Sequence, residues 1–460
     1  MNVLLITYSF PPAAGVGVLR AHSLAKYFPD NGLHVDVLTA RNAAAVGQDA
    51  SLLAQLPPSV AIHRTWTLDL PFALRKAIKK AVSRAPTQQP TTNNQQPAPR
   101  TNPLKRLLAN LLLPDPQVGW LPFALPAARR LIRSRAIDLV LITVPPFSSV
   151  RLATRLRRHF PTLPIVLDFR DEWLTSTLRL VSFNANQRAR AIAQRTESEA
   201  VRDATAVVCA SEAAAAELRH RYPAEPATKF HCIPNGYDTP PPTPTTAPTE
   251  LSFRPEPSQG EAAVEKPATP LTTTLTYIGT VYPSTDPTPV VDAILTLPAE
   301  VRARLHLRFV GHIEVPAYRS TLLRLADPQT GVTLELIPFL PQAQALAYIA
   351  QTDYLLLITH DPINIAAKLY DYLGSGRPIL AAVHPTGDVR RILDLTHAGW
   401  SADIDNPSEI AALITESIAR TPNLTQHFHP NTQAIAAYHR RPLAARYVTL
   451  LRNIAGGPTL

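Results

Sequence analysis

Short apolar runs that alternate with helical stretches are the feature that most limits the folds open to this chain. Such runs, bounded by turn residues, are typical of buried strands in parallel sheets. Expected strands cover residues 3–7, 35–38, 139–144, 165–169, 206–210 and 230–234, and then 274–278, 305–310, 332–337, 354–358 and 378–383. Expected helices cover residues 20–28, 127–135, 149–159 and 186–203, and then 289–296, 318–325, 342–349, 368–373 and 409–420. The pattern predicts an α/β protein with two doubly wound, Rossmann-like parallel sheets.

A Pro- and Thr-rich segment separates the two series. Residues 239–272 have almost no apolar periodicity, so they cannot bury a core and we expect a linker there. The linker divides a first domain, residues 1–238, from a second domain, residues 273–430. We expect a C-terminal helix within residues 431–460, which can return to the first domain. A second low-complexity stretch, at about residues 84–103, is expected to be an insertion on the surface of the first domain.

Charge is distributed unevenly along the sequence. The 460 residues have a formal net charge of +10, and residues 1–235 hold 29 Lys and Arg against 15 Asp and Glu. This balance of +14 leaves −4 for the remainder, so we expect different partners for the two domains. Solvated helix faces explain the basic first domain as well as an anionic membrane or a phosphorylated acceptor does. Nucleic acid is not expected, because we find no helix-turn-helix, zinc or aromatic-interleaved basic pattern.

Two motifs in the first domain follow expected strands. The turn after the first strand contains Gly15 and Gly17, and Arg20 stands where a dinucleotide fingerprint would have its third glycine. This turn either lets a ligand approach the backbone or simply connects a strand to a helix. Arg170 and Asp171 follow a buried strand, at the edge where open α/β sheets bind ligands. They are either ligand-contacting groups or a structural ion pair.

Residues 360–380 give the clearest indication of a ligand site. They run from a strand through a loop to a helix, and then through a glycine-containing turn to the next strand. The free N–H groups at such a helix start suit a diphosphate, although an ordinary crossover has the same layout. Lys368 stands in the first turn, where the helix dipole disfavours a cation, so we expect an anion there to offset it. Asp371, one turn further, is placed to accept hydrogen bonds from ribose hydroxyls.

Taken in order, these motifs resemble the family 4 retaining glycosyltransferases. The matching segments are ITYSFPP at residues 6–12 with Gly15, Gly17 and Arg20, DFRD at residues 168–171 with Trp173, IPNGYD at residues 233–238, YIGT at residues 277–280, FVG at residues 309–311, and AKLYDYL at residues 367–373 with Gly376 and Pro378. They span nearly the whole chain, and their order is the one expected of the family.

The resemblance implies a GT-B fold, in which two Rossmann-like domains face each other across a cleft. It places the nucleotide-sugar donor on the second domain and the acceptor on the first. The donor-binding residues would be Gly279, Thr280, Gly311, Asn364, Ile365, Lys368 and Asp371. The loop facing the acceptor and the donor phosphates would carry Gly15, Gly17 and Arg20, and the catalytic residues would be Arg170, Asp171 and Lys368.

The chain departs from the family pattern at four places, the first of which is Ala14, where a second glycine is frequent. Asp371 stands where the family has Glu, and Ile363 stands at the first acidic position of the same motif. The Arg/Lys pair that usually follows the first strand of the second domain is absent from residues 279–286. Two alternatives to an active transferase therefore stay open, a catalytically silent GT-B partner or binding protein and a sugar-nucleotide epimerase.

No carboxylate pair or Ser/His/Asp set stands out, which suits retaining transfer by a hexosyltransferase-type enzyme of this fold. The departing diphosphate itself takes the acceptor proton, and Lys368 with the helix N–H groups stabilises the developing charge. The expected partners are a nucleotide-sugar, a glycan or lipid-linked acceptor and an anionic membrane surface, and no metal or other cofactor is implied. The first apolar run lacks a basic lead, and no run reaches the roughly 20 residues of a membrane-spanning helix. We therefore expect a cytoplasmic protein, peripheral on the inner face of the membrane.

Overall fold

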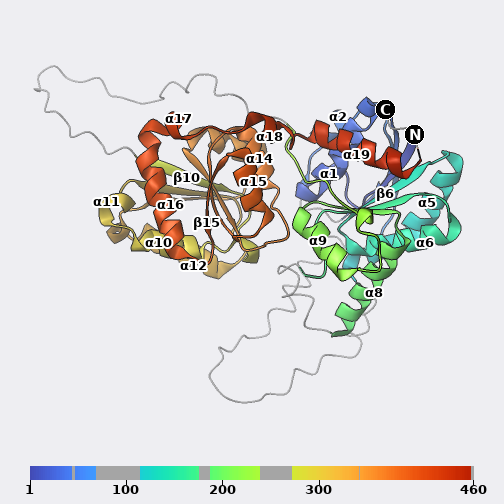
Figure 1. The fold of residues 1–460 in the computed structure, drawn as a ribbon, viewed down its shortest axis with the longest axis horizontal. Coiled ribbons are helices and arrows are strands. Elements are labelled where there is room, and N and C mark those ends of the chain that lie inside the picture. The colour runs from blue at the N-terminus through green and yellow to red at the C-terminus, as the bar shows by residue number, and fades with distance from the viewer. Residues whose placement is uncertain (44–46, 69–113, 176–186, 239–271, 341, 457–460) are drawn as a thin grey trace, which may run out of the picture. The chain divides into compact units, whose positions relative to one another are not determined.

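The computed structural model describes residues 1–43, 47–68, 114–175, 187–238, 272–340 and 342–456. The chain divides into two compact units, Met1–Asn235 with Arg440–Leu460, and Gly236–His439. Each unit is a parallel sheet with helices on both of its faces (Figure 1). The predicted α/β architecture with two Rossmann-like sheets is thus confirmed. The expected insertion at about residues 84–103 and nearly all of the expected linker lie outside the described residues.

The seven-stranded sheet of the first unit has the order β5-β3-β1-β6-β7-β8-β9, and every pair is parallel. Its strands are β1 (Asn2–Ile6), β3 (His34–Ala40), β5 (Ala61–Thr65), β6 (Leu139–Val144), β7 (Ile165–Phe169), β8 (Ala206–Cys209) and β9 (Phe230–Cys232). A short antiparallel pair joins β2 (Ala13–Ala14) to β4 (Gly47–Gln48). The strand order reverses between β1 and β6, so the turns after these two strands form the crevice where open sheets bind ligands.

Helices cover both faces of this sheet. They are α1 (Val16–Tyr27), α2 (Ser51–Ala54), α5 (Leu121–Ser134), α6 (Arg151–His159), α8 (Gln187–Asp203), α9 (Glu212–Arg221) and α19 (Arg440–Ile454). Helices α1 and α19 pack side by side and bury apolar residues such as Leu24 and Leu451 against Val3 and Leu5 of β1. Helix α5 packs against β1, β3 and β5. The last helix of the chain therefore completes the core of the first unit.

The six-stranded sheet of the second unit has the order β12-β11-β10-β13-β14-β15, again all parallel. Its strands are β10 (Thr273–Ile278), β11 (Leu305–Val310), β12 (Thr333–Ile337), β13 (Tyr354–Thr359), β14 (Ile379–Val383) and β15 (Gly399–Asp403). The order reverses between β10 and β13, so the turns after these strands lie at the switch point of this sheet.

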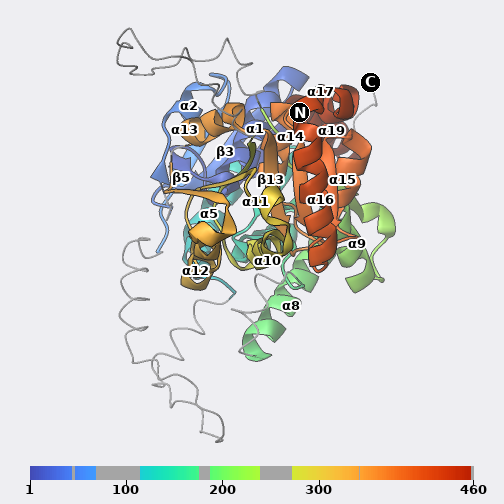
Figure 2. The ribbon, with the colours of Figure 1, turned by 90° about the vertical axis from the view of Figure 1, so that its left-hand side faces the viewer.

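The helices of the second unit are α10 (Thr288–Thr296), α11 (Ala299–Arg302), α12 (Pro316–Leu323), α13 (Gln342–Ala347), α14 (Lys368–Ser375), α15 (Asp388–Thr396), α16 (Pro407–Arg420), α17 (Leu424–His427) and α18 (Thr432–Ala436). Helices α10 and α16 lie side by side in both ribbon views and share one apolar core with Leu275 and Leu307 (Figures 1 and 2). Helices α14, α15 and α18 contribute to a second core with Leu355 and Leu357 of β13. Both faces of the sheet are covered, as expected for near-continuous apolar strands.

Two strands of the large parallel sheets were not predicted from the sequence, because neither has the composition of a buried strand. Strand β5 reads Ala-Ile-His-Arg-Thr and is only half-buried along its length, and β15 reads Gly-Trp-Ser-Ala-Asp. Both are edge strands, so neither needs the apolar run that marks a central strand.

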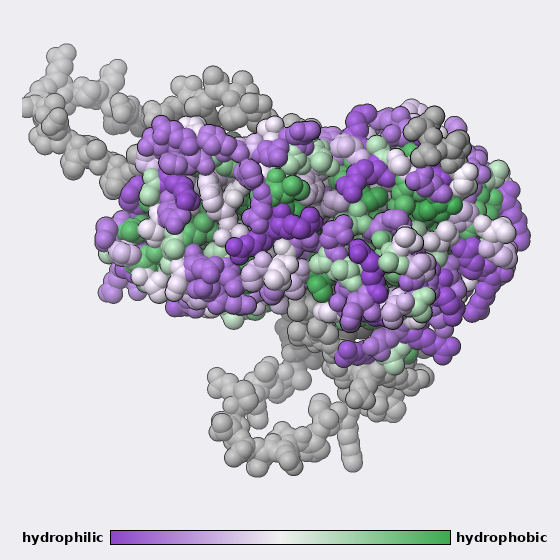
Figure 3. Space-filling model, viewed as in Figure 1, coloured by the Kyte–Doolittle hydropathy of each residue, from purple (hydrophilic) through white to green (hydrophobic). Residues whose placement is uncertain are grey.

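No helix in the described ranges is both long and apolar enough to span a bilayer. The face seen in Figure 3 carries mostly hydrophilic residues, with hydrophobic ones in scattered small patches.

Candidate functional site

The turn after β10 and the turn after β11 approach each other closely at the carboxyl edge of the second sheet. A Cβ placed on Gly311 would lie only 2.3 Å from the carbonyl oxygen of Gly279. Both glycines have positive φ, 123° at Gly279 and 142° at Gly311, which side-chain-bearing residues rarely adopt. The turn after β13 joins them, because the N–H of His360 donates to the Ser284 carbonyl at 2.8 Å. Three strand ends therefore meet at one edge, with backbone exposed where a side chain would intrude.

Lys368, the first residue of α14, reaches this edge. Its Nζ lies 3.6 Å from the ring centroid of Tyr277, and a Cβ on Gly279 would be 3.1 Å from the same nitrogen. The residue is only partly buried, but Nζ is shielded from solvent and has no hydrogen-bond partner among the described residues. Desolvation by this burial lowers the pKa of Lys368 to about 7. The lysine that was expected to face the donor phosphates thus has its amine beside the Gly279 turn, packed against an aromatic ring.

Tyr277 holds the same turn in place through its hydroxyl group. The ring is fully buried at the end of β10 and stacks on Phe309, and its hydroxyl donates to the Thr280 carbonyl at 2.8 Å. Thr280 is therefore held through its backbone. The backbone N–H of Ile278 donates to the Tyr372 hydroxyl of α14 at 2.9 Å, so the helix and the strand end are tied together.

Asp361 organises the loop before α14, and sequence reasoning had not singled it out. Its side chain is almost fully buried, and Oδ1 accepts hydrogen bonds from the N–H groups of Ile363 at 2.9 Å and Asn364 at 3.0 Å. Oδ2 accepts from Nδ2 of Asn364 at 3.1 Å. The signal was present, since an acidic residue just past a strand and before Pro362 is a common turn former. Asn364, predicted to bind the donor, is oriented by this carboxylate.

Helix α14 turns its polar residues to one side. Leu369, Tyr370, Tyr372 and Leu373 are buried, whereas Lys368 and Asp371 are only partly so. The two charged residues stand three positions apart, so they share one side of the helix. Ile365 packs at the border of the apolar core. The structure thus gathers Gly279, Thr280, Gly311 and Lys368 at one edge, with the loop of Asn364 and Ile365 leading into the helix that carries Asp371.

The switch point of the first unit brings together two of the residues predicted there. A Cβ on Gly17 would lie 3.2 Å from a guanidinium nitrogen of Arg170. Arg170 also donates through Nε to the Val144 carbonyl at 3.2 Å and through another nitrogen to the Pro145 carbonyl. Asp171 follows Arg170 and is half-buried, and Gly15, with φ of 125°, has open space where its Cβ would stand.

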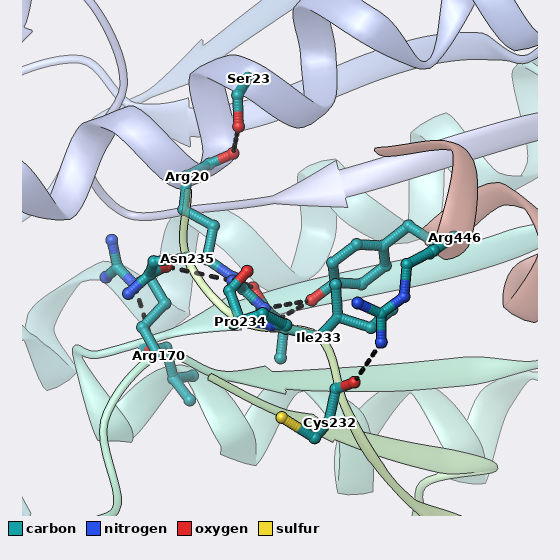
Figure 4. Close-up of polar contacts among 11 residues, drawn as sticks. Arg20, Ser23, Arg170, Cys232, Ile233, Pro234, Asn235 and Arg446 are labelled. Atoms are coloured by element: carbon teal, nitrogen blue, oxygen red, sulfur yellow. Dashed lines mark hydrogen bonds and ion pairs between the residues drawn. The ribbon is translucent and has the colours of Figure 1, made fainter. Parts of the chain in front are cut away.

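Arg20 has a different environment from the one predicted for a ligand-facing residue. It is buried, and its guanidinium donates to Asp168, Tyr447 and Asn235 and to the carbonyls of Ile233 and Pro234, at 2.6 to 3.1 Å (Figure 4). All five N–H groups are engaged by the protein itself. Asp168 is fully buried and also accepts from the Tyr447 hydroxyl at 2.6 Å. Arg20 therefore joins α1, β7, α19 and the segment after β9.

A second buried network holds the loop that follows Arg170 and Asp171. Glu172 accepts from the N–H groups of Leu174 at 2.9 Å and Thr175 at 2.7 Å, and it pairs with Arg221 of α9 at 2.6 Å. Arg221 also pairs with the buried Glu197 of α8 at 2.6 Å. Burial raises the pKa of Glu197 to about 7, although the nearby Arg221 opposes the shift. This network fixes the start of the loop between β7 and α8.

Within the residues that the structure describes, no three His, Cys, Asp or Glu side chains gather in a way that could hold a metal ion.

Two doubly wound parallel sheets, each with its glycine turns at the switch point, define the GT-B class of folds. Residues 85–240 match the model of Glycosyltransferase Family 4. Among curated protein sequences none matches the chain. The predicted resemblance to the family 4 GT-B glycosyltransferases is thereby confirmed.

Solved structures of low sequence identity share the fold along the whole chain. Sucrose-phosphate synthase from Thermosynechococcus elongatus is 13% identical, with 99% of each chain covered and a TM-score of 0.62. Anabaena HepE in complex with UDP and glucose is 13% identical, with 98% of this chain and 100% of that chain covered and a TM-score of 0.59. WaaG, a glycosyltransferase involved in lipopolysaccharide biosynthesis, is 13% identical, with 99% and 100% covered and a TM-score of 0.55.

Proposed function

We propose that this chain transfers a hexosyl group from a nucleotide-sugar to a hydroxyl of a glycan or lipid-linked acceptor, with retention of anomeric configuration. The observation that carries the proposal is the contact between Lys368 and Gly279 at the switch point of the second sheet. A cation, glycine turns and a helix start converge there, and this combination suits the diphosphate of a donor. That HepE has been crystallised with UDP-glucose supports a donor of this chemical class.

In the proposed reaction the protein positions the two substrates and stabilises the leaving group. As the bond from the sugar to the diphosphate breaks, negative charge grows on the departing phosphate oxygen, and the ammonium of Lys368 and the N–H groups that open α14 offset it. The acceptor hydroxyl gives its proton to that oxygen. Arg170 and Asp171 orient the acceptor or the sugar from the first unit. No step calls for a metal or another cofactor.

Lys368 also supplies the charge that the turn after β10 lacks. Residues 279–286 contain no Lys or Arg, although relatives commonly have a basic pair there. In this chain the cation that contacts Gly279 comes from α14. We therefore expect one cation, and not two, to neutralise the donor diphosphate, and Asp371 to contact the ribose in place of a glutamate.

The test has a binding arm and a turnover arm. A panel of nucleoside diphosphates and nucleotide-sugars is screened by thermal shift, because a ligand that binds only the native state raises the apparent stability. The best donor is then used to follow transfer, with the anomeric configuration of the product determined by NMR. We expect Lys368→Met to lower turnover by about 100-fold or more, the range for losing one charge-stabilising group.

Arg377→Met is the matched control. Arg377 follows the same helix and contacts the carbonyl of Ala350, so its loss removes one positive charge away from the glycine turns. Equal losses in the two variants would contradict the phosphate role of Lys368. Donor binding without transfer or hydrolysis would instead favour the alternative of a catalytically silent binding protein. A changed sugar released without acceptor would favour the epimerase.

We further propose that the basic first unit attaches the protein to the anionic inner surface of the cell membrane, where a polysaccharide or other glycan is built. Among the described residues, the exposed arginines Arg130 and Arg133 of α5 and Arg158 of α6 carry positive charge that suits this role. Flotation with vesicles should show binding that grows with anionic lipid and falls with salt. Equal recovery on neutral and anionic vesicles at low salt would refute it.

A further inference from the structure

The amine of Lys368 cannot contact a ligand in the conformation that the structure shows. Its Nζ has almost no solvent-accessible surface and no hydrogen-bond partner among the described residues. It lies 3.6 Å from the centroid of the Tyr277 ring, and a Cβ on Gly279 would stand 3.1 Å from it. A phosphate oxygen needs direct access to form a hydrogen bond with this nitrogen. Either the lysine leaves this place when an anion binds, or it has no phosphate role.

Two residues, Gly279 and Tyr277, form the buried site that holds the Lys368 amine. Gly279 leaves room for the amine, since a Cβ there would approach Nζ to 3.1 Å and Cε to 3.3 Å. Tyr277 provides the ring face, and its hydroxyl bonds to the Thr280 carbonyl at 2.8 Å. One tyrosine therefore holds both the lysine and the backbone of the turn on which we expect the phosphates to lie.

The buried site on the Tyr277 ring is favourable for the Lys368 amine only while no anion is bound nearby. Burying a charged amine without a hydrogen bond is costly, and the attraction of the ring face offsets only part of that cost. The titratable groups near the site within the second unit include the phenols of Tyr277, Tyr372 and Tyr282 and, one turn along α14, the carboxylate of Asp371. None of them contributes to the lowered pKa of Lys368, whose only resolved cause is desolvation.

We propose that Lys368 alternates between a stored position on the Tyr277 ring and an extended position in which its ammonium binds the donor phosphates, so that anion binding is coupled to uptake of a proton by this amine. Tyr277 is then a positioning residue, which holds the lysine in the empty site and releases it to the ligand. The inference rests on the proposed function, because it takes the anion to be the diphosphate of the donor.

The coupling has a definite sign. Above about pH 7 the stored amine is increasingly neutral, and an anion that binds the ammonium must first recruit a proton. The terminal phosphate of UDP titrates near pH 6, so it is already deprotonated in this range. UDP affinity should therefore fall between pH 7 and pH 9, by about 50-fold if the amine stays protonated in the complex.

The experiment measures UDP binding by calorimetry at pH 7, 8 and 9, in buffers of different ionisation enthalpy. The natural chain should take up close to one proton per UDP at pH 8. Lys368→Arg is the matched variant, because a guanidinium stays charged in this range, so both its affinity and its proton balance should be independent of pH. Lys368→Met should bind weakly at every pH. The same loss of affinity with pH in Lys368→Arg as in the natural chain would overturn the proposal.

Tyr277 variants test the storage position. Tyr277→Phe keeps the ring and should keep the pH slope, whereas Tyr277→Leu should flatten it by removing the face on which the amine rests. A ligand-free measurement runs in parallel, namely the rate at which an acylating reagent labels Lys368 in the intact protein. Labelling should be slow in the natural chain and in Tyr277→Phe, and at least several-fold faster in Tyr277→Leu.

The two proposals can fail separately. If UDP and the rest of the nucleotide panel do not bind, the donor assignment fails, and the labelling rates still decide whether Lys368 is stored. If UDP binds without proton uptake, or if Lys368 is labelled as fast as an exposed lysine, the storage inference fails while donor binding stands.

Discussion

Asp168→Asn is expected to destabilise the first unit strongly, although the change keeps the size of the side chain. Asp168 is fully buried, and it accepts hydrogen bonds from Nε of Arg20 at 3.0 Å and from another of its guanidinium nitrogens at 2.9 Å. Tyr447 donates to the same carboxylate at 2.6 Å. Burial alone would lower the pKa of Arg20, but the charges of Asp168 and Tyr447 and their hydrogen bonds to the guanidinium together outweigh that effect and raise the pKa. The asparagine variant therefore leaves a buried guanidinium without its counter-charge.

The expected loss in free energy of unfolding differs between removing the ion pair and removing a single hydrogen bond. Removing one member of a buried ion pair costs about 3 to 5 kcal/mol, because the remaining charge is desolvated and unpaired. Tyr447→Phe is the matched control, because it removes only the hydroxyl that bonds to Asp168 and Arg20 and leaves the ion pair intact. A hydrogen bond to a charged group contributes about 1.5 to 3 kcal/mol, so the control should lose less.

Amide hydrogen exchange is the assay, because a chain of two units need not unfold in one step. Protection is followed in β7 and α19, which the network joins. Asp168→Asn should lower the protection free energy of both elements by more than Tyr447→Phe does. Equal losses in the two variants, or a loss confined to β7, would refute the view that Arg20 and Asp168 tie the C-terminal helix to the sheet.

Two further variants test the site and its support. Gly311→Ala should lower the free energy of unfolding by about 2 to 5 kcal/mol and abolish UDP binding, since its Cβ would meet the Gly279 carbonyl. Gly376→Ala is the control, because Gly376 has positive φ but open space where a Cβ would stand. It should lower the free energy of thermal unfolding by only about 1 kcal/mol and keep UDP binding. Glu197→Gln should remove a pH dependence: the folded state holds this proton up to about pH 7 and the unfolded state only to about pH 4.5, so the natural chain loses stability, by about 3 kcal/mol at most, as the pH rises between these values. The free energies of unfolding of the natural chain and of Glu197→Gln are measured by urea titration across this pH range. A difference between the two that stayed constant with pH would contradict this last expectation.

The sequence predicts the central strands well because burial on both faces demands an apolar run. Leu139–Val144 and Leu305–Val310 were predicted with the same bounds that the structure shows. The edge strands β5 and β15 need no such run, so the sequence alone does not reveal them. Helix α14 was predicted to begin at Lys368, and it does, although no side chain among the described residues caps its first turn.

Motif reading was less able to separate ligand-facing from structural arginines. Arg170 directly follows a strand and Arg20 follows a glycine-containing turn, and both were assigned to the site. Only the structure shows that the five N–H groups of Arg20 are all taken by protein acceptors, and that all of these acceptors come from segments far away in sequence. Arg170 lies instead against Gly17 at the switch point, which leaves it as the arginine to test for acceptor binding.

Sequence motifs also could not show which basic residue lies near the turn after β10, which contains no Lys or Arg of its own. A search along the sequence looks for basic residues next to Gly279, because neighbours in sequence are the only neighbours it can see. In the sheet, β13 lies beside β10, so the segment that follows β13 is delivered to the same edge. Lys368 begins the helix in that segment and reaches Gly279 from the other side of the switch point. On the proposed function this lysine supplies the positive charge that the turn after β10 lacks, and its contact with the Tyr277 ring is the stored position that the labelling experiment tests.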